Sequence, residues 1–588
     1  MSCNDDINVG CLGKRGLQKD LQGVFAVADL SADSLFGGNK RLAFVFISIV
    51  LAYLVIAVRL IDVSSMSCSE LAEVISHEAG KSANRRANIL DRNGMILATN
   101  IETFSVYAHP RQIIRMEEAA AKVAAVLKLN EKDILKKLKG GKQFIWIKRH
   151  ITPYEQEKIR SLGIPGIYEM VDEKRVYPTE RLFSHLVGYV DVDGNGIAGI
   201  ERSFDETLLG SDQSLKLSVD ARVQHALREE LLKSIGINSA VGGFGIVADV
   251  MSGEIVAMVS LPDFDPHQTN KKDKNTFNHA TLAVHEMGST FKILTIAMGL
   301  DTDKIRIDEA FDVSSKLKIG RFEIGDYRGK GGLLSVPEIL MYSSNIGAAQ
   351  IARKVGIAKQ KEYWRKIGML SLVNLPLPEL GRPIYPSGNK WGDVHLITMS
   401  YGHGIAVTAL HTIQAIGAVV NGGILHEPQI LKMENDGVGD PSGAIPEGKR
   451  VFSAKTSNTM RGMLRLVVEQ GGAKKAEVPG YFIGGKTGTS EKVQNGGYNK
   501  KLNLSSCIGV FPIHDPKYII FVAIDEAKSN RINAGFTTGG MIAAPIAGEV
   551  IRKMTGILGV RPYNPDDNKI AKQLYVEYTP RYRMLASR

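Results

Sequence analysis

Residues 288–300, Gly-Ser-Thr-Phe-Lys-Ile-Leu-Thr-Ile-Ala-Met-Gly-Leu, place a serine and a lysine three positions apart at the start of an apolar helix. Residues i and i+3 share one face of a helix, so the amine of Lys292 can reach the hydroxyl of Ser289. A serine hydroxyl is a poor nucleophile until a base removes its proton. The helix N-terminus also favours negative charge that develops on Ser289. The stretch therefore predicts a nucleophilic Ser289 with Lys292 as its base.

Two later motifs, Ser343-Ser344-Asn345 and Lys486-Thr487-Gly488-Thr489, supply further groups that this chemistry needs. Ser343 can pass a proton between the two lysines and a leaving amine, and Asn345 offers an amide that can orient Lys292. A lysine works as a base only if its pKa is lowered, which burial beside a second cation such as Lys486 would achieve. We therefore expect one catalytic group made of Ser289, Lys292, Ser343, Asn345 and Lys486.

The third motif also predicts a surface that binds substrate. Its lysine and its two threonines, Thr487 and Thr489, can bind a carboxylate. The backbone N–H groups of Ser289 and Thr489 can stabilise an oxyanion. The glycines at 484, 485 and 488 are expected to leave room beside a strand for an extended peptide. The expected substrate-binding residues are Thr487, Gly488 and Thr489.

Short patterns of this kind also arise by chance in a long chain. Ser315-x-x-Lys318 fits the first pattern, and Ser82-x-Asn84 and Ser387-x-Asn389 fit the second. A lone lysine on an amphipathic helix is usually solvated, and a lone asparagine usually caps a helix or forms a turn. The order of the three motifs and the context of Ser289, after a glycine and before an apolar helix, favour the catalytic interpretation.

The pattern around these motifs predicts a sheet flanked by helices. A helix is expected over Asp220–Ile235, with Asp220 as its cap, followed by strands Gly245–Asp249 and Glu254–Ser260. A helix-rich stretch runs to Val467. Three more strands are expected at Gly480–Lys486, Ser505–Pro512 and Tyr518–Asp525, and a last helix at Met541–Ile557. This order predicts a multidomain α/β (α+β) chain with an antiparallel sheet covered by helices on both faces.

The chain before the sheet divides into three expected parts. Residues 1–41 form a polar cytoplasmic tail, and residues 42–61 form a transmembrane anchor whose core, Leu42–Val58, carries no charge. Lys40 and Arg41 favour a cytoplasmic N-terminus. A cleaved signal peptide would start nearer Met1, and a buried core helix would show a polar face. Residues 62–215 form a mixed domain.

Three smaller features are expected along the rest of the chain. Residues 89–98 should form a hairpin at Asn93-Gly94, and Glu117–Leu129 should form a helix. Gly194, Gly196 and Gly199 should mark a flexible loop. The last residues, 563–588, are polar and basic, which predicts a loose tail.

The bulk composition excludes several functions. The 588 residues carry a net charge of +11, but the charges are spread and no nucleic-acid motif occurs, so a membrane surface or cell-wall polymer is the expected partner. Four cysteines, Cys3, Cys11, Cys68 and Cys507, form no disulfide framework. No Cys/His spacing suggests zinc, and we expect neither a metal nor a cofactor.

The three motifs together resemble those of penicillin-binding proteins, whose transpeptidase domain is similar to residues 216–562. The segment from Arg86 to Gly94 resembles the opening of the class B pedestal domain, as do Arg175, Tyr177 and Pro178, and Gly196, Gly199 and Glu201. Five positions depart from the family pattern, namely Ala87, His279, His285, Met287 and His403. The resemblance implies the fold shared with serine β-lactamases, with a pedestal at 62–215. The anchor at 42–61 and the basic tail at 563–588 are expected from the sequence pattern itself.

The resemblance also implies a function. The implied function is that of a peptidoglycan D,D-transpeptidase, which acts on D-Ala-D-Ala stem peptides and is acylated by β-lactams. The implied location is the inner membrane, with the catalytic domain in the periplasm. The surroundings of the second and third motifs look most like the cell-division enzyme. No segment resembles a glycosyltransferase, so glycan polymerisation would fall to a partner, a SEDS-type glycosyltransferase among other divisome membrane proteins.

Three alternatives stay open from the sequence. An elongation-specific transpeptidase shares the motifs. A serine β-lactamase or β-lactam sensor also shares them, but we find no Glu-x-x-x-Asn segment between the second and third motifs to activate water for deacylation. A scaffold with a vestigial site is the third alternative, although every catalytic group is present.

Overall fold

A computed structural model describes residues 40–65, 86–268, 273–320, 322–327, 329–387, 391–433, 447–494, 497–564 and 567–581. The predicted tail before residue 40 and the segment 66–85 lie outside these ranges. The chain divides into two compact units, Met1–Ala83 and Asn84–Arg588.

The first unit contains one described helix, α2 (Lys40–Ser65), which includes the predicted anchor. Its large apolar side chains from Phe44 to Val58 are exposed. Among the helices in the described part of the chain, none combines the length and the apolar composition that crossing a membrane requires.

The second unit begins with a mixed sheet in which β2 (Ile96–Ala108) pairs with three other strands. The predicted hairpin is confirmed, because β1 (Ile89–Leu90) pairs antiparallel with β2 across a turn at Gly94. The remaining strands of this sheet are β3 (Ile145–Ile151), β4 (Ile167–Val176) and β5 (Leu215–Lys216). Three helices build a separate small core against it: α4 (Met116–Leu127), α5 (Glu131–Leu138) and α6 (Pro153–Leu162). The first of these confirms the predicted helix.

The segments that resemble the pedestal meet in a buried ion network. Glu201 is completely buried and accepts hydrogen bonds from Arg86 Nε at 2.5 Å and from Arg175 Nε at 2.8 Å. It lies in α8 (Gly199–Ser203), which is followed by α9 (Asp205–Leu208). A Cβ at Gly196 would lie 2.1 Å from the Glu201 carbonyl oxygen. A Cβ at Gly199 would lie 2.5 Å from the Leu186 carbonyl oxygen, whereas one at Gly194 would meet nothing within 4 Å. The prediction of a flexible loop is therefore wrong at Gly196 and Gly199, because both allow close packing of the backbone.

We expect Glu201→Ala to lower the free energy of unfolding by about 3–5 kcal/mol, because it leaves two buried guanidinium groups without their carboxylate. Urea unfolding followed by circular dichroism measures this. The matched control is Glu206→Ala, which removes an exposed acid of the neighbouring helix and should change stability by less than about 0.5 kcal/mol. Equal effects of the two substitutions would contradict a stabilising role of the network.

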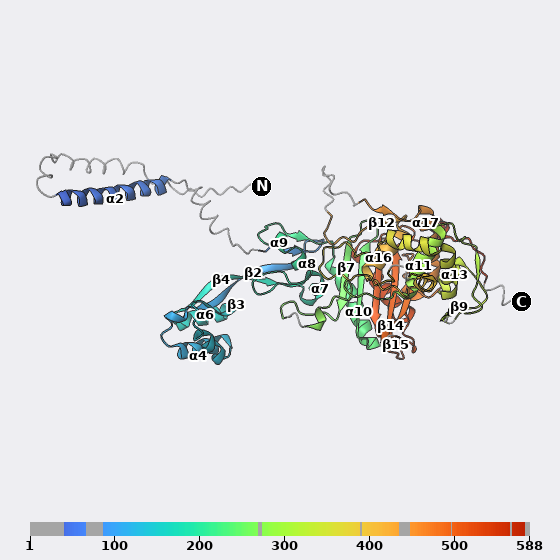
Figure 1. Ribbon diagram of the computed structural model, residues 1–588, viewed down its shortest axis with the longest axis horizontal. Helices are drawn as coiled ribbons and strands as arrows, with labels where there is room; N and C mark the ends of the chain where they lie inside the picture. The colour runs from blue at the N-terminus through green and yellow to red at the C-terminus, as the bar shows by residue number, and fades with distance from the viewer. Residues whose placement is uncertain are drawn as a thin grey trace. The chain divides into compact units, whose positions relative to one another are not determined.

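The predicted antiparallel sheet is confirmed, with strand order β14-β15-β16-β6-β7. Figure 1 shows that β7, in green, lies in the same sheet as β14 and β15, in orange and red, although more than 200 residues of chain separate them. The strands are β6 (Gly242–Asp249), β7 (Ile255–Leu261), β14 (Gly484–Gln494), β15 (Gly497–Phe511) and β16 (Tyr518–Asp525). The predicted bounds of β16 are those of the structure.

Three of these strands are longer than the sequence predicts, and β6 is the least extended of them, since it starts at Gly242 rather than Gly245. β14 starts at Gly484, four residues after the predicted start, and continues to Gln494. β15 starts at Gly497 rather than Ser505. Lys486 therefore lies inside a strand instead of at the end of one. The reason is that the polar half of β14 is held by backbone pairing to β15, up to Gln494 with Gly497, and not by an apolar face.

Helices cover both faces of this sheet, as predicted. On one face, α10 (Ala221–Asn238) packs against α18 (Gly539–Ile557), and the side chain of Asp220 caps α10 as expected. On the other face, α16 (Ala409–Val420) packs against β6 and β16 and contacts α11 (Lys292–Asp301). Further helices are α7 (Ser184–Val187), α12 (Val336–Tyr342), α13 (Asn345–Val355), α14 (Ile357–Lys366), α15 (Asp393–Ser400) and α17 (Ala454–Glu469).

Two expectations outside the sheet need correction. The helix-rich stretch also contains small strand pairs, which are too short for a sequence pattern: β8 (Ala310–Asp312) with β11 (Leu333–Ser335), β9 (Leu317–Ile319) with β10 (Phe322–Ile324), and β12 (Ile424–Leu425) with β13 (Lys449–Arg450). The C-terminal region is not loose over residues 567–581. There, α19 (Asn568–Leu574) packs on α17 and buries Ile570 and Leu574.

Candidate active site

Ser289 and Lys292 lie at the start of α11, where the sequence places them. A 3-10 turn, Gly288–Phe291, leads into the helix and holds the half-buried Ser289 in its first turn. Ser289 Oγ lies 2.8 Å from Lys292 Nζ. The Lys292 side chain is completely buried. The predicted nucleophile and base are therefore in hydrogen-bond contact.

The second motif brings its serine and its asparagine to the same amine. Lys292 Nζ lies 3.1 Å from Ser343 Oγ, 2.8 Å from the Ser343 carbonyl oxygen and 2.6 Å from Asn345 Oδ1. Ser343 ends α12 with φ of 60°, a left-handed conformation that is unfavourable for a residue with a side chain. Asn345 starts α13. The strained turn between these helices points both side chains at Lys292.

A segment that the sequence analysis missed holds this turn in place. Asp326 accepts hydrogen bonds from Ser344 Oγ at 2.6 Å and from the backbone N–H groups of Asn345 at 2.5 Å and Ile346 at 3.0 Å. The neighbouring Gly325 carbonyl accepts from Asn345 Nδ2 at 3.1 Å. No motif spacing marks Asp326, because two of its three contacts are to the backbone. It positions Asn345 for its contact with Lys292.

The third motif completes the site from the edge of the sheet. Lys486 is buried, and its Nζ donates to Ser343 Oγ at 3.0 Å and to the Thr487 carbonyl at 3.0 Å. Thr487 and Thr489 are half-buried, whereas Gly488 between them is buried. Thr489 Oγ1 accepts a hydrogen bond from the Gly539 N–H at 3.0 Å. Ser343 Oγ is thus shared by the two lysines, as predicted.

The glycines near this motif do not serve the role that the sequence analysis gave them. A Cβ at Gly484 would lie 2.5 Å from the Ile513 side chain, and one at Gly485 would lie 2.5 Å from the Ile508 carbonyl. At Gly488 it would meet Ser506 Oγ at 2.4 Å and the Met287 carbonyl at 2.7 Å. The space is filled by protein rather than left for a peptide. Gly488 lets β14 approach the segment before Ser289 closely.

The two buried amines titrate in an unusual range. Burial, and then the charge of Lys486, lower the pKa of Lys292 well below its ordinary value, and the Asp326 carboxylate opposes this shift. Burial lowers the pKa of Lys486 to about 8. A lysine with such a lowered pKa can be neutral near physiological pH and act as a base.

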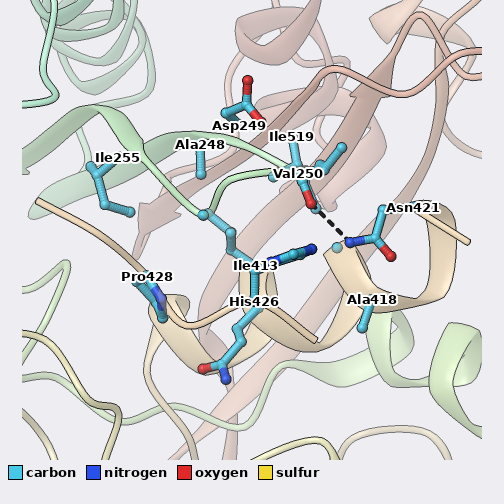
Figure 2. A pocket seen from close by; sticks show the side chains of 13 residues that line it. Ala248, Asp249, Val250, Ile255, Ile413, Ala418, Asn421, His426, Pro428 and Ile519 are labelled. Carbon is cyan, nitrogen blue, oxygen red and sulfur yellow. Dashed lines mark hydrogen bonds between the residues drawn. The ribbon is translucent and has the colours of Figure 1, made fainter. Parts of the chain in front are cut away.

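A small cavity between α16 and the strands β6 and β16 is too small to bind a peptide (Figure 2). Its cavity volume is about 20 Å³, which is room for about one water molecule. Asn421 Nδ2 donates to the Val250 carbonyl at 2.8 Å across its edge. The residues that line it, such as Ile413 and Ile519, include none of the predicted site residues. Within the described ranges, no group of three or more His, Cys, Asp or Glu side chains is arranged to hold a metal.

Comparison with known families and proteins agrees with this geometry. Residues 243–552 match the family described as the penicillin binding protein transpeptidase domain, and residues 81–234 match the penicillin-binding protein dimerisation domain. A protein of Caulobacter vibrioides named probable peptidoglycan D,D-transpeptidase FtsI is 36% identical over 81% of this chain and 82% of its own length. The Escherichia coli peptidoglycan D,D-transpeptidase FtsI is 27% identical over 82% of this chain and 84% of its own.

The fold is also similar to solved structures. Penicillin binding protein 3 from Mycobacterium tuberculosis, crystallised with aztreonam, superposes with a TM-score of 0.65 at 24% identity. The match covers 82% of this chain and 98% of that one. A peptidoglycan synthetase from Bifidobacterium adolescentis gives a TM-score of 0.65 at 22% identity, over 83% and 98% of the two chains.

Proposed function

Because the chain belongs to the penicillin-binding protein transpeptidase family, we propose that it is a peptidoglycan D,D-transpeptidase with Ser289 as its nucleophile. Ser289 attacks the D-Ala-D-Ala carbonyl of a donor stem peptide and releases D-Ala. An amine of a neighbouring stem then takes the acyl group. The observation that supports this most strongly is the contact of 2.8 Å between Ser289 Oγ and the buried amine of Lys292.

The contacts of Lys292 suit a neutral amine. Asn345 Oδ1 and the Ser343 carbonyl can only accept hydrogen bonds, so they take the two protons of the neutral group. The remaining lone pair is then available to the Ser289 hydroxyl. Lys292 takes the proton as Ser289 attacks, and Ser343 Oγ, in contact with both lysines, passes it to the leaving amine.

The edge of β14 suits the rest of the substrate. Lys486 supplies a positive charge, and Thr487 and Thr489 supply hydroxyl groups for the terminal carboxylate. β14 ends the strand order of the sheet, so one of its edges pairs with no other strand of the described residues and is the edge to which an extended peptide would add. We assign the oxyanion to the backbone N–H groups of Ser289 and Thr489. The proposed substrate-binding residues are therefore Thr487 and Thr489, together with Gly488, which lets the strand that carries them approach the segment before Ser289 closely.

We expect the rate constant for acylation by penicillin to be bell-shaped in pH. It rises as Lys292 loses its proton, because only the neutral amine is a base. It falls above pH about 8, because Lys486 then loses the charge that attracts the carboxylate. Stopped-flow measurement of the acylation rate constant from about pH 5 to 10 covers both the rise and the fall, because this range includes the pH at which lowered lysine pKa values are found.

The variant Lys486→Arg tests the assignment of the alkaline limb. An arginine stays charged throughout this range, so the variant should keep the acid limb and lose the decline near pH 8, whatever its absolute rate. A decline at the same pH in Lys486→Arg would show that another group is responsible.

β-Lactams are expected to acylate Ser289 and to be released slowly, which separates this function from that of a β-lactamase. The full chain should carry one fluorescent penicillin, which mass spectrometry should locate on the peptide that contains Ser289. Hydrolysis of many penicillin molecules per chain would instead favour the β-lactamase or sensor alternative.

We assign the enzyme to septal synthesis, on the resemblance of the second and third motifs to the cell-division enzyme. Depletion of the protein should then give filaments, whereas rounded cells would favour the elongation enzyme. A SEDS-type glycosyltransferase and other divisome membrane proteins are the proposed partners, since the matched families account for residues 81–234 and 243–552 and neither is a glycosyltransferase.

We further propose that residues 42–61 anchor the chain in the inner membrane, with residues 1–41 in the cytoplasm. The uncharged run from Leu42 to Val58 and the exposed apolar side chains of α2 support this. Residues 62–215 would form the pedestal and residues 216–562 the transpeptidase domain in the periplasm. Extraction of the full chain from membranes by alkaline carbonate would contradict the anchor.

A further inference from the structure

A carboxylate just before the nucleophile gathers groups from two other parts of the chain. Glu286 accepts hydrogen bonds from the Gly404 N–H at 2.7 Å and the Tyr498 hydroxyl at 3.0 Å. His403 Nδ1 lies 3.0 Å from the other Glu286 oxygen. Tyr498 belongs to β15, and its ring contacts the His403 ring with centroids 5.5 Å apart. We call Glu286, His403 and Tyr498 the rim cluster.

The rim cluster lies beside Ser289. The Gly288 N–H donates to the Gly402 carbonyl at 3.2 Å, and a Cβ at Gly402 would lie 2.1 Å from the Gly288 carbonyl oxygen. His403 therefore directly follows Gly402, and Gly402 contacts Gly288, the residue before Ser289. The side chains of His403 and Glu286 are 24% and 17% exposed, so the pair is partly open to solvent.

The carboxylate fixes which nitrogen of His403 is basic. A carboxylate accepts hydrogen bonds, so the proton of the neutral imidazole resides on Nδ1, and Nε2 is left with a lone pair. No hydrogen bond to His403 Nε2 is formed by the described residues. This is the arrangement of a histidine base that is oriented by a carboxylate.

The second half of the proposed reaction needs such a base. Lys292 is neutral again once its proton has left with D-Ala, so it can take one proton from the acceptor. A primary amine at neutral pH arrives as an ammonium ion, which must lose two protons to form an amide. Lys292 can accept only one of these two protons, so the other needs a second base.

We propose that His403, held by Glu286, is the base that deprotonates the acceptor ammonium ion; the proposal rests on the transpeptidase function above. The ammonium ion gives one proton to His403 Nε2. The neutral amine then attacks the acyl carbon, its new C–N bond replaces the ester bond to Ser289, and its second proton passes through Lys292 to Ser289 Oγ. His403 later releases its proton to water.

The charges around His403 suit a cationic acceptor. Glu286, within the rim cluster, and Glu491, outside it, both act electrostatically on Tyr498. These two carboxylates would attract an ammonium ion. Burial and Glu286 raise the pKa of Tyr401 to about 12, and burial and Glu286 also raise the pKa of Tyr498. Neither phenol is therefore a base near neutral pH, whereas an imidazole exchanges protons in that range.

The test compares acyl transfer with hydrolysis in the detergent-solubilised full chain. A thioester of an N-acyl-D-alanine serves as donor and D-alanine as acceptor amine. At pH 7 we expect His403→Gln to lower the ratio of amide to hydrolysis product about 100-fold, while the rate constant of acylation by penicillin changes less than twofold. The defect should shrink as the pH approaches the pKa of the acceptor amine, which then arrives already neutral.

The matched control is His225→Gln, an exposed histidine of α10, which should leave the ratio unchanged. An unchanged ratio in His403→Gln at pH 7, or a loss that is equal at every pH, would overturn the proposal. Failure of the transpeptidase function would look different, because the unaltered chain would then form no acyl-enzyme with either the thioester or penicillin.

Discussion

Lys292→Met should slow acylation by penicillin by about 10³- to 10⁴-fold, because it removes the only amine in contact with Ser289 Oγ among the described residues. Methionine has a similar length and suits a completely buried position, so the variant should fold. The substitution leaves Asn345 Oδ1 and the Ser343 carbonyl without their donor, at a cost of about 1–3 kcal/mol for each buried group. We therefore expect the melting temperature to fall moderately while the chain stays folded, so that the loss of activity far exceeds any loss of folded protein.

The measurement is the second-order rate constant of acylation, taken together with the melting temperature. The chain offers its own control, since Ser315 and Lys318 have the same spacing but lie on the surface. The side chain of Lys318 is 79% exposed and pairs with Glu323. Lys318→Met should therefore acylate at the unaltered rate. Acylation of Lys292→Met within tenfold of that rate would mean that another group removes the Ser289 proton.

The sheet shows where sequence reasoning succeeds and where it stops. The sequence predicts β16 with its true bounds because seven of its eight residues are buried and apolar residues dominate it. The sequence does not predict the second half of β14, from Thr489 to Gln494, which carries mostly polar residues. Its conformation follows from pairing with β15, which a pattern of local hydrophobicity does not contain.

The residues of the site also fall into a group that the sequence predicts and a group that it does not. Groups that act through a side chain at a fixed spacing, such as Ser289 and Lys292, could be predicted. Asp326 could not, because it binds backbone N–H groups that the fold brings to it. The motif marks Gly488, but the sequence does not predict its role, since its close neighbours, Met287 and Ser506, are distant in sequence.

Two serines of the site, Ser289 and Ser343, are both candidates for the nucleophile. Ser343 Oγ touches both lysines, at 3.1 Å and 3.0 Å, and by distance alone it is as good a candidate for the nucleophile as Ser289. Two features favour Ser289. It lies in the first turn leading into α11, where the helix dipole favours the developing anion. Ser343 Oγ instead accepts a hydrogen bond from Lys486, which makes its oxygen less nucleophilic.

Ser289→Ala should therefore abolish covalent labelling by fluorescent penicillin and lower acyl transfer by about 10⁴-fold or more. Its stability should change by only about 1 kcal/mol, since one hydrogen bond to Lys292 is lost. Ser343→Ala should still be labelled at Ser289, but slowly, because the proton then lacks its path to the leaving group. Ser315→Ala, the surface control, should be labelled at the unaltered rate. An adduct on Ser343 in the Ser289→Ala protein would reverse the roles of the two serines, because the hydroxyl between the lysines would then be the attacking group.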